Sequence, residues 1–295
     1  MKIADAHCDT LTTFPNKPFF EETAHWNVTK FRKSGGVLQY MAIFTPAEYA
    51  GSDAANYALR AAGNLYKSLP KECNILTSAD DWNDEKLNIV LTLEGASPII
   101  NSVENLYAFY QLGVRTITLT HNHRNFLADG VGSNYGLTEF GRMIIEECEK
   151  LNIIIDVSHL SDKGFQDVAA IAKKPFMASH SNCRTLCDMP RNLTDDQIKV
   201  IVSKKGFIGL NLYTKFVSDR EDNLTLQFCK HIEHFLKFGA EDILGLGADL
   251  DGIPETPFID YEGIQRVLTN VLRLDESIVE KIMSKNLINF TMSSI

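Results

Sequence analysis

Residues 138–157 read TEFGRMIIEECEKLNIIIDV and contain one complete helix-and-strand unit. In the first part of this stretch, apolar residues recur three or four positions apart, at Phe140, Ile144, Ile145, Cys148 and Leu151. This spacing predicts an amphipathic helix over Thr138–Leu151. The run Ile153–Val157 is instead apolar at almost every position, which is typical of a strand buried on both faces. A helix next to such a strand indicates an α/β protein.

Helical patterns of the same kind recur along the chain. A further helix is expected to start at Thr194, because Gln197 follows at the spacing of a capping box. The remaining amphipathic stretches cover Ala54–Leu69, Asn223–Phe238 and Glu262–Leu272. Three glycines follow helical stretches and are expected to end them in the left-handed conformation: Gly113, Gly206 and Gly239.

Short apolar runs between the helices predict eight strands, and strands that alternate with helices form parallel sheets. Eight such units favour a closed (β/α)8 TIM barrel, a single domain over residues 1–295. The alternative, an open doubly wound sheet, usually has a glycine-rich turn after its first strand, whereas residues 6–9 here are Ala-His-Cys-Asp. The predicted strands are Lys2–Ala6, Leu38–Phe44, Ile89–Leu93, Arg115–Leu119, Ile153–Val157, Pro175–Ala178, Phe207–Asn211 and Ile243–Ala248.

The composition is that of an ordinary globular protein, with 295 residues, 44% of them hydrophobic, and a formal net charge of −9. The acidic balance argues against a broad basic surface for nucleic acid. No apolar run is long enough for a membrane span, and Asp5 and Asp9 stand where a signal peptide would be apolar. We therefore expect a cytoplasmic protein with no membrane partner, whose six cysteines are free thiols. Cys183 and Cys187 have no second cysteine pair with which to form a structural zinc site.

Polar residues follow most of the predicted strands. In a TIM barrel, the carboxyl ends of the strands form one rim, and catalytic residues collect there. Each residue alone has an ordinary structural explanation, such as a salt bridge or a hydrogen-bonded core histidine. Together they predict a metal or acid–base site on one rim, built from His7, Asp9, Glu94, His121, His159, His180 and Asp249.

The candidate ligands are imidazoles and carboxylates without thiolates, a set that suits Zn²⁺, although Mn²⁺, Fe²⁺ or Co²⁺ could also bind. His7 and Asp9 are two residues apart, so an extended segment would present both on the same face. Five ligands (those two with Glu94, His159 and His180) are more than one catalytic zinc uses. Two zinc ions bridged by Glu94 would use all five.

Three further positions are candidates for catalysis or substrate binding. Asp249 is favoured over Asp251 because it stands at the predicted strand end, but both remain open. His121 is nearer to its strand than His123, which is expected to be exposed or to support the site from behind. Arg191 lies just before a predicted helix start, where a surface position is equally compatible with the sequence.

These residues resemble the membrane (renal) dipeptidase family of zinc metallopeptidases, within the amidohydrolase-like barrels. The matching segments occur in the family's order between residues 5 and 252: DAHCD, LEG, TLTHN, GLTEFG, IIDVSH, ASHS, RNLTDDQ and GADLDG.

The resemblance implies a role for each candidate residue. His7 and Asp9 would bind one zinc ion, His159 and His180 the second, and Glu94 both. Asp249 would be the catalytic acid–base, and the side chains that contact substrate would be His121, Arg191 and, by a looser match, Tyr213. The family also suggests a homodimer.

The implied reaction is hydrolysis of a dipeptide with a free C-terminal carboxylate by a hydroxide that bridges the two zinc ions. Whether D-residues are accepted at that end is left open. An amidohydrolase acting on another amide, lactam or ester bond is the alternative, because the fold and the metals do not fix the substrate. A catalytically silent binding barrel is a third hypothesis. It would be expected to have lost a ligand or the catalytic aspartate, and neither is missing here.

Overall fold

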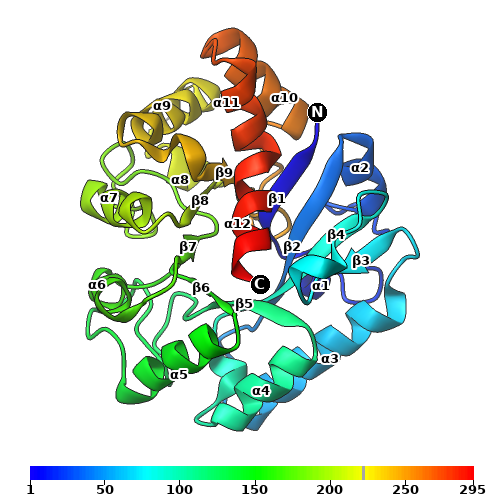
Figure 1. Cartoon of the computed structure of the whole chain (residues 1–295), viewed down its shortest axis with the longest axis vertical. Helices are drawn as coiled ribbons and strands as arrows, with labels where there is room; N and C mark the ends of the chain where they lie inside the picture. The colour runs from blue at the N-terminus through cyan, green and yellow to red at the C-terminus, as the bar shows by residue number, and fades with distance from the viewer. Residues whose placement is uncertain (221–222) are drawn as a thin grey trace.

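The computed structural model describes residues 1–220 and 223–295, and in them eight parallel strands close into a barrel surrounded by helices (Figure 1). Closure comes from the pairing of β2 with β4, which continues over Leu38–Phe44 and Asn88–Glu94. The predicted (β/α)8 TIM barrel is thereby confirmed. Its strands are β1 (Ile3–Cys8), β2 (Gly36–Phe44), β4 (Leu87–Glu94), β5 (Val114–Thr118), β6 (Ile154–Asp156), β7 (Met177–Ala178), β8 (Phe207–Leu210) and β9 (Leu244–Leu246).

A ninth strand, β3 (Cys73–Ile75), was not predicted. It pairs with Leu87–Ile89 at the start of β4, whereas β5 pairs with the same strand only from Leu91 onward. The first residues of β4 thus have an edge that β5 leaves free. Strand β3 pairs with this edge without becoming one of the eight barrel strands. Three residues with only one aliphatic side chain among them are too short for a recognisable strand pattern.

The predicted strands differ from the observed ones by at most two residues at either end. Two such differences bear on the site: the first strand continues through His7 to Cys8, and the sixth begins at Met177 rather than Pro175. Proline has no N–H group for the sheet, so it precedes the strand here. His7 therefore belongs to the strand itself, rather than to the turn that follows it.

The predicted helices are observed with the expected caps. Thr138 accepts a hydrogen bond from the N–H of Gly141, and Thr194 forms a capping box with Gln197. The stretch from Glu262 is only partly α-helical, because it continues as the π-helix η4 (Val267–Val271). The α-helices are α1 (Thr10–Thr13), α2 (Val28–Lys33), α3 (Ser52–Ser68), α4 (Val103–Gln111), α5 (Glu139–Lys150), α6 (Asp162–Ile171), α7 (Asp195–Ser203), α8 (Thr214–Val217), α9 (Leu224–Lys237), α10 (Tyr261–Arg266), α11 (Glu276–Glu280) and α12 (Asn286–Ser294). Short 3-10 and π segments complete them: η1 (Ala79–Asp81), η2 (Ser97–Ile99), η3 (Ala240–Asp242) and η5 (Lys281–Lys285).

Two of the three glycines expected after helices have the left-handed backbone, with φ of 92° at Gly113 and 80° at Gly239. The prediction for Gly206 is wrong, since Lys205 occupies the left-handed position with φ of 54°. Gly206 serves close packing instead, because a Cβ atom there would lie 2.2 Å from the carbonyl oxygen of Phe176.

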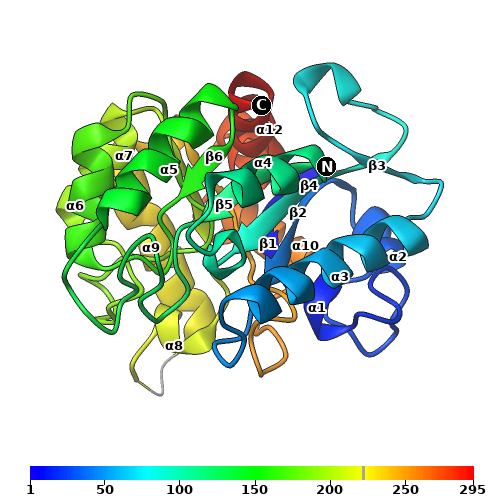
Figure 2. The ribbon, with the colours of Figure 1, turned by 90° about the horizontal axis from the view of Figure 1, so that it is seen from below.

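Helix α12 closes one end of the barrel. The rings of Phe207 in β8 and Phe290 in α12 have their centroids 5.9 Å apart, and the hydroxyl groups of Tyr40 and Thr291 are 2.8 Å apart. Figure 2 shows α12 and the N-terminus at one end of the molecule, with α1 and α8 toward the other. The polar strand ends therefore collect at the end opposite α12. The apolar interior below them consists of Ala4, Ala6, Val37, Leu38, Tyr40, Leu76, Val90, Ile154, Met177, Phe207, Leu287 and Phe290.

All six cysteines are buried free thiols, as expected. In the part of the chain that the structure describes, the possible metal-binding clusters contain neither Cys183 nor Cys187. A search of the same residues finds no helix with the length and apolar character needed to cross a bilayer.

We predict that Gly209→Ala destabilises the protein by about 2–3 kcal/mol, because overpacking at a backbone contact forces the strands apart. The new Cβ atom would lie 1.9 Å from the carbonyl oxygen of Ser179. Gly63→Ala in α3 is the matched control, since nothing lies within 4 Å of its Cβ position. This control should raise stability by up to about 1 kcal/mol through helix propensity. Urea unfolding followed by circular dichroism measures both, and equal midpoints for the two variants would contradict the packing argument.

Candidate metal centre

The candidate ligands meet at the open end of the barrel, as the sequence predicted. His7 lies in β1, Glu94 is the last residue of β4, and His180 follows β7. Two of the residues in this group have the left-handed backbone, with φ of 66° at His159 and 61° at Asp249. Strained backbone at non-glycine residues often marks a functional site, because the surrounding structure must hold it.

Glu94 stands between two groups of side chains, and each of its carboxylate oxygens faces one of them. Oε1 lies 3.0 Å from Nε2 of His159 and 3.7 Å from Nε2 of His180. Oε2 lies 3.4 Å from Nε2 of His7, which is in turn 3.3 Å from Oδ2 of Asp9. All five side chains are at least nine-tenths buried. This arrangement gives two adjacent sets of nitrogen and oxygen donors that share one carboxylate.

In the described part of the chain, two ligand atoms of this cluster have no hydrogen-bond partner, and two others face one another. Nε2 of His7 and Oδ1 of Asp9 are buried and have no hydrogen-bond partner among the described residues. Nε2 of His159 and Nε2 of His180 face one another at 2.9 Å. Nδ1 of His159 lies 2.9 Å from Oδ1 of Asn122, an acceptor, so Nδ1 carries the proton and Nε2 offers its lone pair to the cluster. A divalent cation satisfies such a set, and the residues present fit one.

The electrostatics of the cluster are those of like charges forced together. Burial and, to a smaller extent, the neighbouring Glu94 raise the pKa of Asp9 to about 7. Burial also raises the pKa of Asp249 to about 6. Burial alone would lower the pKa of His7, but Glu94 and Asp9 outweigh it and hold that pKa well above its ordinary value. For His159 and His180, burial lowers the pKa well below the ordinary value, which keeps both rings neutral.

The two candidate aspartates after β9 have different surroundings. Oδ1 of Asp249 faces the cluster, 4.0 Å from Nε2 of His7, and its Oδ2 accepts a hydrogen bond from Nδ2 of Asn211 at 2.9 Å. The carboxylate of Asp251 instead accepts from the Thr10 hydroxyl at 2.5 Å and from the backbone N–H of His25 at 2.6 Å. Asp251 therefore fastens the segment after β1, and Asp249 is the aspartate available to the cluster.

His121 lies at the edge of the cluster and is partly exposed, whereas His123 is exposed. The His121 ring centroid is 4.4 Å from that of His159 and 4.8 Å from that of Phe44, which packs edge-on against it. Burial, with a smaller effect of Arg191, lowers the pKa of His121 to about 4. The imidazole is therefore neutral near pH 7 and has one N–H group to donate.

Arg191 is buried, although the sequence alone was also compatible with a surface position. Its Nη2 donates to the carbonyl oxygen of His180 at 3.2 Å, and its guanidinium carbon lies 5.3 Å from the ring centroid of Phe216. Its Nε has no hydrogen-bond partner, and residues 1–220 and 223–295 offer it no carboxylate within 4.0 Å. A buried guanidinium without a counter-ion is an anion-binding group.

A cavity of about 400 Å³ opens over the cluster. Its lining includes Tyr213, just before α8, and Phe216 within that helix, together with Ile253, Pro254 and Phe44. The structure thus brings Tyr213 into the same cavity as Glu94, His121, His159, Asp9 and Asp249. This volume is that of a small-molecule site.

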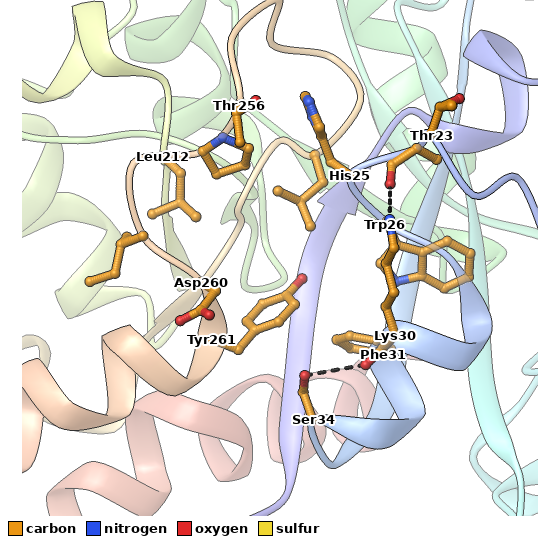
Figure 3. Close-up of a pocket in the computed structure, with 14 residues that line it drawn as sticks. Thr23, His25, Trp26, Lys30, Phe31, Ser34, Leu212, Thr256, Asp260 and Tyr261 are labelled. Atoms are coloured by element: carbon orange, nitrogen blue, oxygen red, sulfur yellow. Dashed lines mark hydrogen bonds between the residues drawn. The ribbon is translucent and has the colours of Figure 1, made fainter.

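A second cavity, of about 420 Å³, lies behind the segment after β1. Figure 3 shows His25 and Trp26 on one side of it and Leu212, Asp260 and Tyr261 on the other. Asp251 lies between the two cavities, because it lines the first and binds the backbone of His25 in the second. The second cavity contains none of the clustered ligands, so the chemistry belongs to the first.

The comparisons with known proteins agree with this geometry. Residues 1–293 match the family described as membrane dipeptidase (peptidase family M19). The chain belongs to this family. A crystal structure described as a dipeptidase and metallopeptidase of family M19 has 26% sequence identity and a TM-score of 0.91, with 100% of this chain and 98% of that one covered.

Two relatives by sequence come from a bacterium and a yeast. An uncharacterised protein from the pqqA 5′ region of Klebsiella pneumoniae is 34% identical, over 69% of this chain and 80% of the relative. An uncharacterised dipeptidase of Schizosaccharomyces pombe is 29% identical, over 80% of this chain and 62% of the relative. A metallopeptidase from Rhodobacter sphaeroides, solved with a phosphinate mimic of the dipeptide L-Ala-D-Ala, shares the fold with a TM-score of 0.91 at 24% identity, with 100% and 99% of the two chains covered.

Several polar residues at this membrane dipeptidase site were not singled out in the sequence. Asn122 binds His159, and Asn211 binds Asp249. Both stand at the carboxyl end of a strand, in segments that also contain a candidate residue. A complete inventory of polar residues at strand ends, amides included, would have found them.

We predict opposite stability changes for the two aspartates after β9. In Asp251→Asn, one acceptor oxygen becomes an NH2 group that faces another donor. The free energy of unfolding should therefore fall by about 2 kcal/mol. Asp249→Asn removes one carboxylate from a crowded anionic cluster, so the metal-free protein should keep or gain stability. The left-handed backbone at both positions makes them a matched pair, with φ of 65° and 61°. Thermal unfolding in the presence of a chelator measures both, and a larger loss in Asp249→Asn would reverse the assignment.

Proposed function

We propose that this M19 metallopeptidase is a zinc-dependent dipeptidase that hydrolyses dipeptides with a free C-terminal carboxylate. The observation that carries the proposal is the position of Glu94, whose two oxygens face two separate donor sets beside a buried arginine without a counter-ion. We also propose that residues 1–295 form one catalytic domain. The homodimer and the cytoplasmic location stay predictions.

We propose two zinc ions per chain. His7 and Asp9 would hold one ion, His159 and His180 the other, and Glu94 would bridge them. This assignment gives a partner to the two buried ligand atoms that lack a hydrogen bond to any described residue, Nε2 of His7 and Oδ1 of Asp9. When bound, such a pair polarises a carbonyl group and lowers the pKa of a water molecule so that it attacks at neutral pH.

Proton transfer falls to Asp249 in this proposal. Asn211 holds its Oδ2, so Oδ1 is the oxygen that faces the reacting atoms. A carboxylate placed in this way can accept a proton from water and pass it to the leaving amine. His121, neutral at pH 7, is placed to donate a hydrogen bond to the oxyanion that develops on the scissile carbonyl.

Arg191 would bind the C-terminal carboxylate of the substrate. The guanidinium offers a planar fork for a carboxylate, and Phe216 holds its face. A longer peptide has a further residue in place of this free carboxylate, so the same group would exclude it. Tyr213, in the wall of the cavity, is proposed as a further substrate contact. The dipeptide mimic bound by the Rhodobacter sphaeroides protein motivates including D-residues at the C-terminal position.

We predict chelator-sensitive release of amino acids from L-Ala-L-Ala or L-Ala-D-Ala by the zinc-loaded protein. N-acetyl-Ala tests the second candidate function, an amidohydrolase acting on another amide, lactam or ester bond. Cleavage of N-acetyl-Ala without cleavage of either dipeptide would replace the proposal with that candidate. Metal content measured on the same samples shows whether two equivalents of zinc accompany the activity.

We predict that Arg191→Ala raises KM for a dipeptide about 100-fold or more, with a smaller change in kcat, because a charged hydrogen bond to the carboxylate is lost. Arg184→Ala is the control, since Arg184 is already paired with Asp162 at 2.7 Å. The dipeptide amide, which lacks the carboxylate, should show no such difference between wild type and Arg191→Ala. If Arg191→Ala left the KM for the dipeptide with a free carboxylate unchanged, carboxylate binding would belong to another residue.

A further inference from the structure

Two buried carboxylates hold the strand ends behind the candidate metal centre. Asp5, in β1, accepts hydrogen bonds from the N–H of His7 at 3.0 Å and the N–H of Ala248 at 3.1 Å. Asp156, in β6, likewise accepts from the N–H of Ser158 at 3.0 Å and the N–H of Ser179 at 2.9 Å. Each carboxylate therefore joins its own strand end to that of a neighbouring strand.

Asp156 makes one connection that Asp5 does not make. Its Oδ2 accepts from the Ser179 hydroxyl at 2.6 Å and from the Thr118 hydroxyl at 2.7 Å. The Ser179 oxygen also lies 2.7 Å from Nδ1 of His180. The second contact of Asp5 is instead with the hydroxyl of Tyr261, at 2.7 Å, and leads to no imidazole. A continuous path therefore runs from Asp156 through one hydroxyl to a candidate metal ligand.

The direction of the hydrogen bonds along this path follows from the donors available. Four donors surround Asp156, and each of its two carboxylate oxygens accepts two of them. Ser179 has one hydroxyl proton, and the contact with Asp156 takes it. The Ser179 oxygen must then accept from Nδ1–H of His180.

From this geometry we propose that Asp156 and Ser179 are positioning residues that fix the tautomer of His180. With the proton on Nδ1, Nε2 of His180 presents its lone pair to the cluster, where Nε2 of His159 lies 2.9 Å away. Second partners of this kind commonly orient metal-binding histidines and tune their affinity. The inference rests on the proposed function, because it takes His180 to be a metal ligand.

The fixed tautomer of His180 accounts for the close approach of two imidazole lone pairs, those of His159 Nε2 and His180 Nε2. Asn122 sets the proton of His159 on Nδ1. The path from Asp156 through Ser179, called the relay below, sets the proton of His180 on Nδ1, so no proton is left between the two Nε2 atoms. Without the relay, His180 could turn its N–H toward His159 and close the site with an internal hydrogen bond. Ser179 and Asp156 thus keep the lone pair of His180 Nε2 available to a cation.

The test reads the tautomer in the metal-free protein by two-bond ¹H–¹⁵N correlation spectra at neutral pH, with the His180 signals assigned from their loss in His180→Gln. Wild type should show Nδ1–H at His180. Ser179→Ala should shift the population toward Nε2–H, and so should Asp156→Asn, whose NH2 group would free the serine proton for the imidazole. Thr118→Val is the matched control, because it removes a bond to the same Asp156 oxygen and should leave the tautomer unchanged.

Zinc affinity gives the second readout, by competition of ZnCl2 between the protein and a chromophoric chelator. Ser179→Ala should weaken binding of one zinc equivalent about 10–100-fold, the range typical of lost partners of metal ligands, and Thr118→Val should weaken it much less. An unchanged Nδ1–H tautomer in both Ser179→Ala and Asp156→Asn would overturn the relay. That result would leave the dipeptidase proposal intact. A wild-type protein that binds no zinc and cleaves no dipeptide would instead overturn the dipeptidase proposal and leave the tautomer result standing.

Discussion

Three carboxylates crowded beside one another impose the constraint on which the rest of the site depends. Asp9, Glu94 and Asp249 all lie within 4.0 Å of Nε2 of His7; the first two are buried and Asp249 is largely shielded. Taking such charges out of water is costly unless cations offset them, and the raised pKa values of Asp9 and Asp249 express that cost. Among the imidazoles of the cluster, only that of His7 has a raised pKa, so a bound cation would offset negative charge that His7 alone does not balance.

The barrel accommodates this crowding because its apolar interior and the polar cluster lie toward opposite ends. Tyr40, Phe207 and Phe290 fill and cap the apolar interior, and the polar groups gather only at the opposite end. Strained backbone at His159 and Asp249 is held by hydrogen bonds from neighbouring strand ends. Hydrophobic burial elsewhere in the chain thus offsets an electrostatically unfavourable site, an exchange common among enzymes.

The sequence predicted the barrel well because buried parallel strands have a strong apolar signal and each is followed by a polar residue. It did not predict β3, whose three residues carry almost no pattern, or the position of Gly206, which depends on a carbonyl group from another strand. The role of Asp251 was also out of reach of the sequence. Its partners lie more than two hundred residues away, so only the folded chain shows that it fastens the segment near His25.

Asparagine side chains connect the two halves of the proposed substrate site. Asn192, next to Arg191, accepts a hydrogen bond from the N–H of Asn182 at 3.3 Å. Asn182 exchanges two bonds with the backbone of Asn211, at 2.9 and 3.1 Å, and Asn211 donates to Asp249 at 2.9 Å. This chain of amides fixes the proposed carboxylate-binding group relative to the proposed proton carrier. Such a network preorganises the distance between a binding group and a reacting group, which is how a site comes to suit a ligand of one length.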